Sequence, residues 1–225
     1  MNYTFQFGQV FAHFNELLWG ALLTLRLSAL SMVLGLLIAI LAALGLTYGN
    51  RLVRTLITAY VEVIRNTPFL VQIALVFFGL PSFGIRLDPN QAGLLAMVIN
   101  ISAYSTEIVR AGVESITRGQ IEAAIALGLR NLTIFRLIIL PRALQIVYPA
   151  LTSQFVLVML SSSVLSTIST EELTAVANNI DSTTFRTIEV YLVVAAMYFV
   201  LSMIFSLLFH VLYKFYFRSI PAARG

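Results

Sequence analysis

The chain has 225 residues, of which 59% are hydrophobic and 11% are charged, whereas an ordinary soluble domain has roughly 25% charged residues. So few charges could not cover a water-soluble surface, which excludes that class and indicates an integral membrane protein. The absence of cysteine excludes disulfides and thiolate chemistry, the formal charge is +4, and the two histidines lie too far apart in the sequence to suggest a metal site.

The N-terminal stretch, residues 1–18, lacks the basic region with which a signal peptide begins. It is rich in phenylalanine, and a tryptophan follows at position 19, so we expect an interfacial segment that leads into the membrane. Residues 19–213 then form the membrane domain, and residues 214–225 form a cytoplasmic tail.

Five long apolar runs predict five transmembrane helices, because a spanning helix needs about 20 residues. They cover residues 17–46, 55–80, 92–109, 137–170 and 190–213. A transmembrane barrel would instead show alternation with a period of two. We therefore predict an all-α integral membrane fold, with a kink in the second span at Asn66-Thr67-Pro68 and interruptions of the fourth span at Pro141 and Pro149.

The basic residues set the predicted orientation, since cytoplasmic loops carry an excess of lysine and arginine. They concentrate after the first span, between the third and fourth spans, and at the C-terminus: Arg51, Arg54, Arg110, Arg118, Arg130, Arg136, Arg142, Lys214, Arg218 and Arg224. This alternation fits five crossings, with the N-terminus outside and the C-terminus in the cytoplasm.

The longest cytoplasmic connection contains a short helical sequence, "IEAAIALGL", at 121–129. Thr117 and Gln120 have the spacing of a capping box, and Gly128 is placed to end the helix in a left-handed turn. Asn131 would then cap a second helix that leads into the fourth span. We predict a helix, a sharp turn and a second helix between the third and fourth spans.

This short helix has two possible roles. It could be an interfacial amphipathic connector, but its alanines, among them Ala123 and Ala124, bury little area in lipid. No apolar core of this chain is expected in the cytoplasm to receive it. A small-residue surface suits close packing against another protein, so we favour a docking element for a cytoplasmic partner.

A resemblance follows from the same segment. It is similar to the E-A-A-x3-G-x9-I-x-L-P pattern of bacterial binding-protein-dependent ABC importer permeases of the type I fold, and the stretches 60–81 and 103–129 resemble the polar amino acid uptake subfamily. The likeness runs over nearly the whole chain. The matching positions are Glu122, Ala123, Ala124, Gly128, Ile138, Leu140 and Pro141.

The resemblance implies a set of partners and a mechanism. The short helix would be the coupling helix, which sits on a separate ATPase subunit, with Glu122 contacting that subunit and Gly128 setting the turn. Two ATP-binding cassette subunits would carry ATP and Mg²⁺, and a second permease chain, the same or related, would complete the path. A solute-binding protein outside the bacterial inner membrane would deliver a polar amino acid to the outer loops 81–91 and 171–189.

The chain has no ATPase machinery of its own. A phosphate-binding loop needs GxxxxGK[ST], and the sole lysine, Lys214, follows a tyrosine. No catalytic, metal-ligand or nucleic-acid-binding arrangement is present, so we predict a transport subunit and not an enzyme. A self-contained secondary transporter or channel is the main alternative, although such transporters usually show internal repeats that we do not find here. A structural or assembly subunit is a third possibility.

Two pairs of oppositely charged residues within the spans have a spacing of three, Glu62 with Arg65 and Glu107 with Arg110. Each pair can share a helix face and partly offset the cost of burial in the membrane. We interpret them as ion pairs that orient the helices, in preference to substrate contacts.

The fourth span contains the best candidates for the solute path, the hydroxyl run "SSSVLSTIS" at 161–169. On an α-helix, Ser162, Ser166 and Ser169 share one face, and Ser163 and Thr167 share another. These hydroxyls could line a water-filled path or serve helix packing, and both readings stay open. Further path candidates are Asn100, Tyr104 and Gln154. Many chains that this one resembles have K-D-[ST]-S-L where it has "LSSSV" at 160–164, so those charges are missing here.

Overall fold

The computed structural model describes residues 4–217, in which all regular secondary structure is helical. This confirms the predicted all-α class. The helices are α1 (Phe7–Ala12), α2 (Phe14–Tyr48), α3 (Arg51–Arg65), α4 (Phe69–Ala74), α5 (Pro89–Glu114), α6 (Arg118–Ala126), α7 (Asn131–Ile134), α8 (Leu140–Ser161), α9 (Leu173–Thr184) and α10 (Thr187–Phe217).

Four helical stretches within the described residues are long and apolar enough to span a membrane: Phe14–Tyr48, Pro89–Glu114, Asn131–Ile168 and Thr187–Tyr216. A fifth exists if the bent pair Arg51–Arg65 and Phe69–Phe83 counts as one span. The helix axis bends by 109° between these two segments, so the expected kink at Pro68 is a complete break. The second span is therefore not the single rod that its hydropathy predicts.

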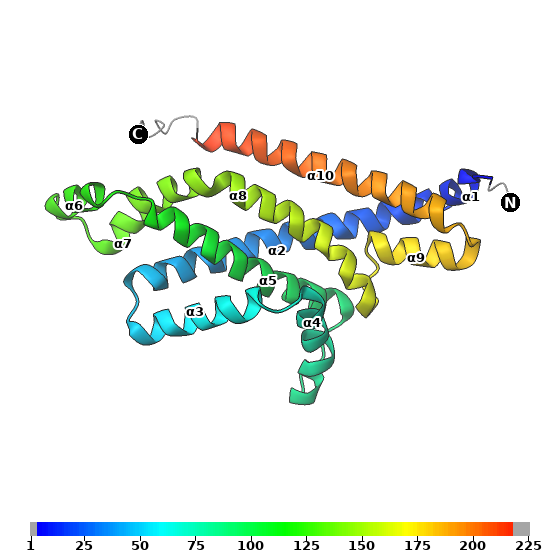
Figure 1. Ribbon diagram of the computed structural model, residues 1–225, viewed down its shortest axis with the longest axis horizontal. Helices are drawn as coiled ribbons and strands as arrows, with labels where there is room; N and C mark the ends of the chain where they lie inside the picture. Colours follow the sequence, from blue (N-terminus) through cyan, green and yellow to red (C-terminus); the bar gives the residue numbers. More distant parts are fainter. Residues whose placement is uncertain (1–3, 218–225) are drawn as a thin grey trace.

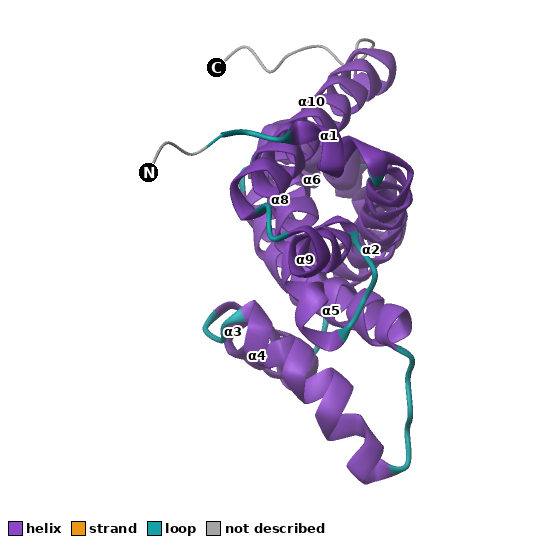
Figure 2. Ribbon diagram, turned by 90° about the vertical axis from the view of Figure 1, so that its right-hand side faces the viewer, coloured by secondary structure: helices purple, strands orange, loops and turns teal. Residues whose placement is uncertain are grey.

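The long helices run side by side, with α1 and α9 at one end of the bundle and α6 at the other (Figure 1). Helix α1 and the last turn of α10 lie at opposite ends, as an odd number of crossings requires. Viewed from the end, α3 and α4 extend away from the bundle formed by the other long helices (Figure 2). The predicted cytoplasmic tail falls mostly on residues 218–225, outside the described part of the chain.

Small residues bring the central helices together. In the membrane, helix association depends on close packing, because lipid is as apolar as leucine. A Cβ at Gly35 of α2 would lie 2.2 Å from Ile101 of α5, and one at Gly112 of α5 would lie 2.9 Å from the backbone oxygen of Ala143 in α8. Helix α5 therefore contacts α2 on one side and α8 on the other.

We expect Gly112→Leu to destabilise the fold, because a side chain there meets a backbone oxygen that has little room to move. Overpacking a core costs about 1–3 kcal/mol, and the thermal denaturation midpoint in detergent should fall by several degrees. Gly8→Leu is the matched control, since a Cβ at Gly8 has nothing within 4 Å. Equal midpoints for the two variants would contradict the close approach of α5 and α8.

Two prolines are accommodated by π-helical turns that precede them. Leu75–Gly79 is π-helical before Pro81, and Phe135–Ile139 is π-helical before Pro141. The wider turn changes the hydrogen-bond pattern where proline lacks a donor and its ring crowds the preceding turn. The predicted interruption of the fourth span is therefore a local change of helix type, and Pro149 lies inside α8 without ending it.

The N-terminal segment is held against the end of the bundle that carries α9. The backbone N–H of Gln6 donates to a carboxylate oxygen of Glu189 over 2.9 Å, and Arg186 donates to the Gln6 side chain over 2.8 Å. Rings of successive phenylalanines from Phe5 to Phe14 also lie in contact. Because α2 begins at Phe14, the predicted boundary between residues 18 and 19 lies inside a helix.

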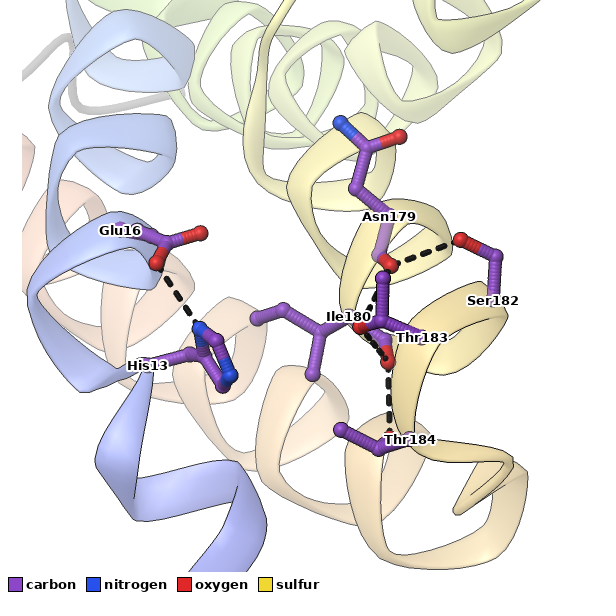
Figure 3. A network of polar contacts seen from close by, with 7 residues as sticks. All are labelled: His13, Glu16, Asn179, Ile180, Ser182, Thr183 and Thr184. Atoms are coloured by element: carbon purple, nitrogen blue, oxygen red, sulfur yellow. Dashed lines mark hydrogen bonds and ion pairs between the residues drawn. The ribbon is translucent and has the colours of Figure 1, made fainter.

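Hydroxyl side chains in the last turn of α9 donate to carbonyl oxygens of the same helix, beside the start of α2 (Figure 3). Thr183 and Thr184 donate to the carbonyl oxygen of Ile180 over 3.0 and 2.7 Å, and His13 and Glu16 bond to each other over 2.8 Å.

At the start of α9, the Glu172 carboxylate accepts from the backbone N–H groups of Thr174 and Ala175 and from the Tyr198 hydroxyl. Burial raises the pKa of the Glu172 carboxyl, and these hydrogen bonds oppose that rise. Two acidic residues of the stretch 171–189, Glu172 and Glu189, are thus fully buried inside this chain, so they are not available to a binding protein.

Candidate coupling surface and solute cavity

Helix α6 begins without the predicted capping box. Thr117 is the N-cap residue, but its side chain makes no capping hydrogen bond. The backbone N–H of Gln120 donates instead to the Thr117 carbonyl oxygen over 3.1 Å. The spacing located the start of the helix correctly, while the side-chain geometry differs from the expectation.

The end of α6 is a left-handed glycine turn, as predicted. Gly128 has φ +74°. Its N–H donates to the Ile125 carbonyl over 2.9 Å, and the N–H of Leu129 donates to the Ala124 carbonyl over 3.2 Å. This pair of bonds is the Schellman arrangement, which satisfies carbonyls left over at a helix end. Asn131 is the first residue of α7 and not its cap, because Arg130 occupies the cap position.

The adjacent alanines Ala123 and Ala124 of α6 face different surroundings. Ala124 is only 2% exposed and packs in an apolar cluster with Ile116, Ile134, Phe135 and Ile139. The expectation that no core of this chain receives the helix is therefore wrong for that face. Ala123 and Glu122 are exposed on the same helix. One face of α6 anchors the helix to the spans, and the rest is available to a partner.

The available surface of α6 exposes large apolar side chains and includes a groove. Ile125 is 56% and Leu127 is 79% exposed, although α6 lies at the end of the bundle. A groove of about 470 Å³ separates α6 from the start of the fourth span. Its lining residues are Gln120, Ala123, Ala124, Leu127, Leu137, Ile138, Pro141 and Arg142.

Three of the six predicted coupling residues line the groove. Ala123, Ala124 and Pro141 line it, and Gly128 ends the helix beside it. Leu140 packs instead against the apolar cluster under α6. The family pattern did not single out four lining residues, Gln120, Leu127, Leu137 and Arg142.

A second cavity, of about 500 Å³, lies between the break of the second span and helices α5 and α8. It brings together three predicted path residues, Asn100 and Tyr104 from α5 and Gln154 from α8. The other lining residues are Arg65, Asn66, Thr67, Pro68, Phe69, Leu157, Val158 and Ser161. We refer to it as the polar cavity.

The hydroxyl run after α8 does not form the faces that an α-helix would give. Residues Ser162–Ile168 form a 3-10 helix, so side chains three apart align. Ser162 is fully buried beside Leu165 and Ile168, and its hydroxyl donates to the Met159 carbonyl over 2.6 Å.

Three further hydroxyls of the run also donate to carbonyls of their own helix. Ser163, Ser166 and Thr167 each donate to the carbonyl three residues earlier, over 2.8 Å. None of these three lines the polar cavity, whereas Ser161, the first hydroxyl of the run, does. Pairing Ser162 with Ser166 and Ser163 with Thr167 was therefore wrong.

Of the two predicted ion pairs, one is present. Arg110 bonds to Glu107, with Nε 3.0 Å from Oε2, and also to Glu114. Glu62 instead accepts from the Asn66 amide over 3.1 Å. The guanidinium of Arg65 lies 5.7 Å from the centre of the Tyr104 ring, and within residues 4–217 it forms no ion pair with Glu62.

The break in the second span depends on a residue that sequence reasoning missed, Gln72. Its side chain is 5% exposed. The amide donates to the carbonyls of Ile64 and Thr67 over 2.8 and 3.1 Å, and its oxygen accepts from Asn100 over 2.9 Å. These bonds satisfy backbone groups that the break leaves open. A lone glutamine in the apolar run "FLVQIALVFF" was the available signal.

The sequence of this chain is similar to those of several known transport permeases. The chain is 35% identical to the nopaline transport system permease protein NocM of Agrobacterium fabrum, over 86% of this chain and 84% of that protein. It is 34% identical to the glutamine transport system permease protein GlnP of Escherichia coli, over 90% and 93%. It is 33% identical to the L-cystine transport system permease protein TcyB of Bacillus subtilis, over 86% and 83%.

Solved structures agree with the fold. An amino acid ABC transporter crystallised with histidines superposes with a TM-score of 0.84 and 35% identity, over 94% of this chain and 99% of that one. The MetNI methionine ABC transporter in an inward-facing conformation superposes with a TM-score of 0.78 at 20% identity, over 91% and 98%, which supports the fold alone. Residues 35–218 match the family model, and the chain belongs to the binding-protein-dependent transport system inner membrane components.

Proposed function

We propose that this chain is the membrane subunit of an ATP-driven importer that moves a polar amino acid into the cell by alternating access. Two such subunits, identical or related, would enclose the solute path, because five spans alone make a thin wall around it. Two separate ATPase subunits would bind ATP and Mg²⁺ on the cytoplasmic side. A solute-binding protein would deliver the amino acid from outside.

The exposed apolar surface of α6 carries this proposal. A helix outside the spans that buries one alanine face in its own protein and exposes Ile125 and Leu127 is suited to dock on another protein. Movement of a docked partner would reach the spans through the cluster under α6, which includes Ile134 and Ile139. ATP-driven closure of the ATPase dimer would thus tilt the third and fourth spans.

The relatives and the polar cavity support an amino acid as solute. Relatives with more than 30% identity over most of the chain are named for transport of glutamine, nopaline and cystine. The polar cavity offers amide, hydroxyl and guanidinium groups between the spans. Its volume, about 500 Å³, lies in the range of about 300–1,000 Å³ that is usual for small-molecule sites.

Copurification tests the docking surface. Leu127→Glu places a charge where an apolar contact is expected, so the variant should lose the ATPase subunit when the complex is purified in mild detergent. Phe185→Glu is the matched control, because Phe185 is 85% exposed at the opposite end of the bundle. The control should retain the ATPase. Equal ATPase recovery with both variants would show that α6 is not the docking element.

A further inference from the structure

The polar cavity holds one charged side chain and no carboxylate. Among its lining residues only Arg65 is charged, and the other polar groups are the neutral side chains Asn66, Thr67, Asn100, Tyr104, Gln154 and Ser161. The cavity therefore has a fixed positive charge. A ligand that enters it meets one cation and several neutral donors and acceptors.

Arg65 is placed to receive an anion. Its guanidinium lies against the Tyr104 ring, and within residues 4–217 no carboxylate lies within 4.0 Å of it, whereas Arg110 binds two glutamates. An arginine in a cavity between spans gains from a carboxylate partner, because the planar guanidinium matches the two carboxylate oxygens. Glu107 attracts Arg65 electrostatically without bonding to it, so a bound ligand can supply the direct carboxylate contact that Arg65 lacks within residues 4–217.

The nearby acidic side chains do not belong to the polar cavity. Glu62 is bonded to Asn66. Together with Glu107 and Arg110, it lines a separate cavity between α2, α3 and α5. Glu62 and Glu107 already have hydrogen-bond partners there, and neither lines the polar cavity beside Tyr104.

Neutral hydrogen-bond acceptors line the polar cavity together with the Arg65 guanidinium. The Asn100 amide donates to Gln72, which leaves its oxygen as an acceptor at the cavity wall. Gln154 and Ser161 add a carbonyl and a hydroxyl from α8. Such groups can accept from an ammonium group, and they can also pair with an amide or hydroxyl side chain.

We infer that Arg65 binds the α-carboxylate of the transported amino acid and that the polar cavity selects zwitterionic amino acids with neutral polar side chains. A cationic side chain would find no carboxylate and would be repelled by Arg65. An acidic side chain would find no second cation. This inference rests on the proposed function and names the substrate class of the same cavity.

The test is direct binding to the purified permease–ATPase complex without the solute-binding protein, so that the binding protein cannot impose its own selectivity. The probe is labelled L-glutamine, competed by unlabelled L-glutamine, L-glutamate, L-arginine and L-lysine. We expect the neutral amino acid to compete at least about ten-fold better than each charged one, as the loss of one charged contact requires. Equal or better competition by L-arginine would overturn the inference.

The role of Arg65 is tested with a ligand that lacks the carboxylate. Wild-type complex should bind L-glutamine at least about ten-fold more tightly than L-glutaminol. Arg65→Met should remove most of that preference, and Arg65→Lys should keep part of it. If Arg65→Met bound both ligands with the wild-type ratio, Arg65 would not contact the carboxylate.

A gain-of-function variant keeps the inference testable if Arg65 variants fail to assemble. Ser161→Asp adds the missing carboxylate to the cavity wall and should shift preference towards L-arginine by about ten-fold. Ser163→Asp is the matched control, because Ser163 lies two residues further on, does not line the cavity and should leave preference unchanged. An unchanged preference in Ser161→Asp would contradict the inference.

These outcomes are separable from failure of the proposed function. If the complex takes up neutral and cationic amino acids equally well with ATP, the importer stands and the selectivity is wrong. If no amino acid is taken up with ATP, the proposed function itself fails.

Discussion

Replacing Gly128 with valine should abolish coupled transport while the membrane helices remain inserted. Gly128 has φ +74°, a conformation that costs a β-branched residue about 1–3 kcal/mol. Valine would open the two Schellman bonds that end α6 and would redirect the chain towards α7. Because α6 is the proposed contact with the ATPase, amino acid uptake per ATP hydrolysed should fall at least about ten-fold, roughly the effect of 1.4 kcal/mol.

Two controls isolate the turn. Gly128→Asn should retain most coupling, since asparagine adopts the left-handed conformation more readily than other residues. Gly119→Ala lies in the first turn of the same helix, where a Cβ has nothing within 4 Å, and it should transport like wild type. Normal coupling in Gly128→Val would show that the geometry of this turn is not needed to transmit the motion.

Replacing Gln72 with methionine should cause a large loss of stability at the break of the second span. The substitution keeps the side-chain length but leaves the carbonyl of Thr67 and the amide of Asn100 without their partner, and it removes one of the bonds to the carbonyl of Ile64, which Thr67 also donates to. Each buried polar group left unpaired costs about 1–3 kcal/mol. We expect a clear drop in the thermal denaturation midpoint in detergent, together with reduced uptake, because Asn100 also lines the polar cavity.

A double-mutant cycle identifies the source of that loss. Asn100→Leu removes the partner of Gln72, so the double variant should be destabilised by less than the sum of the two single changes. The measurement is the denaturation midpoint of the four proteins under one condition. Strictly additive losses would mean that the bond between the two side chains contributes nothing to the break.

The features that the sequence predicted best depend on local chemistry. The spans follow from apolar length, and the stop of α6 follows from Gly128, because only a few residue types accept a left-handed turn. The assignment of the α6 alanines to a partner surface was wrong for Ala124. The reason is tertiary: the ends of the third and fourth spans converge and bury that face, and no local pattern shows this.

The candidate solute path also combines residues that the sequence predicted with an arrangement that only the tertiary fold creates. Hydrophobicity and polarity identified Asn100, Tyr104 and Gln154 one by one, but their common cavity exists only because the second span breaks. The faces predicted for the hydroxyl run assumed 3.6 residues per turn, whereas the segment is a 3-10 helix. Arg65 was paired with Glu62 from spacing alone, while the fold places it against Tyr104 from another helix.

The most direct test of the account is uptake of labelled L-glutamine into proteoliposomes that contain the permease, its ATPase and its binding protein. ATP is supplied on the side that carries α6. The account predicts accumulation of the amino acid against its gradient, only with hydrolysable ATP and only while α6 holds the ATPase. Uptake at the same rate without ATP, or with a non-hydrolysable analogue, would show a self-contained transporter or channel and would contradict the account.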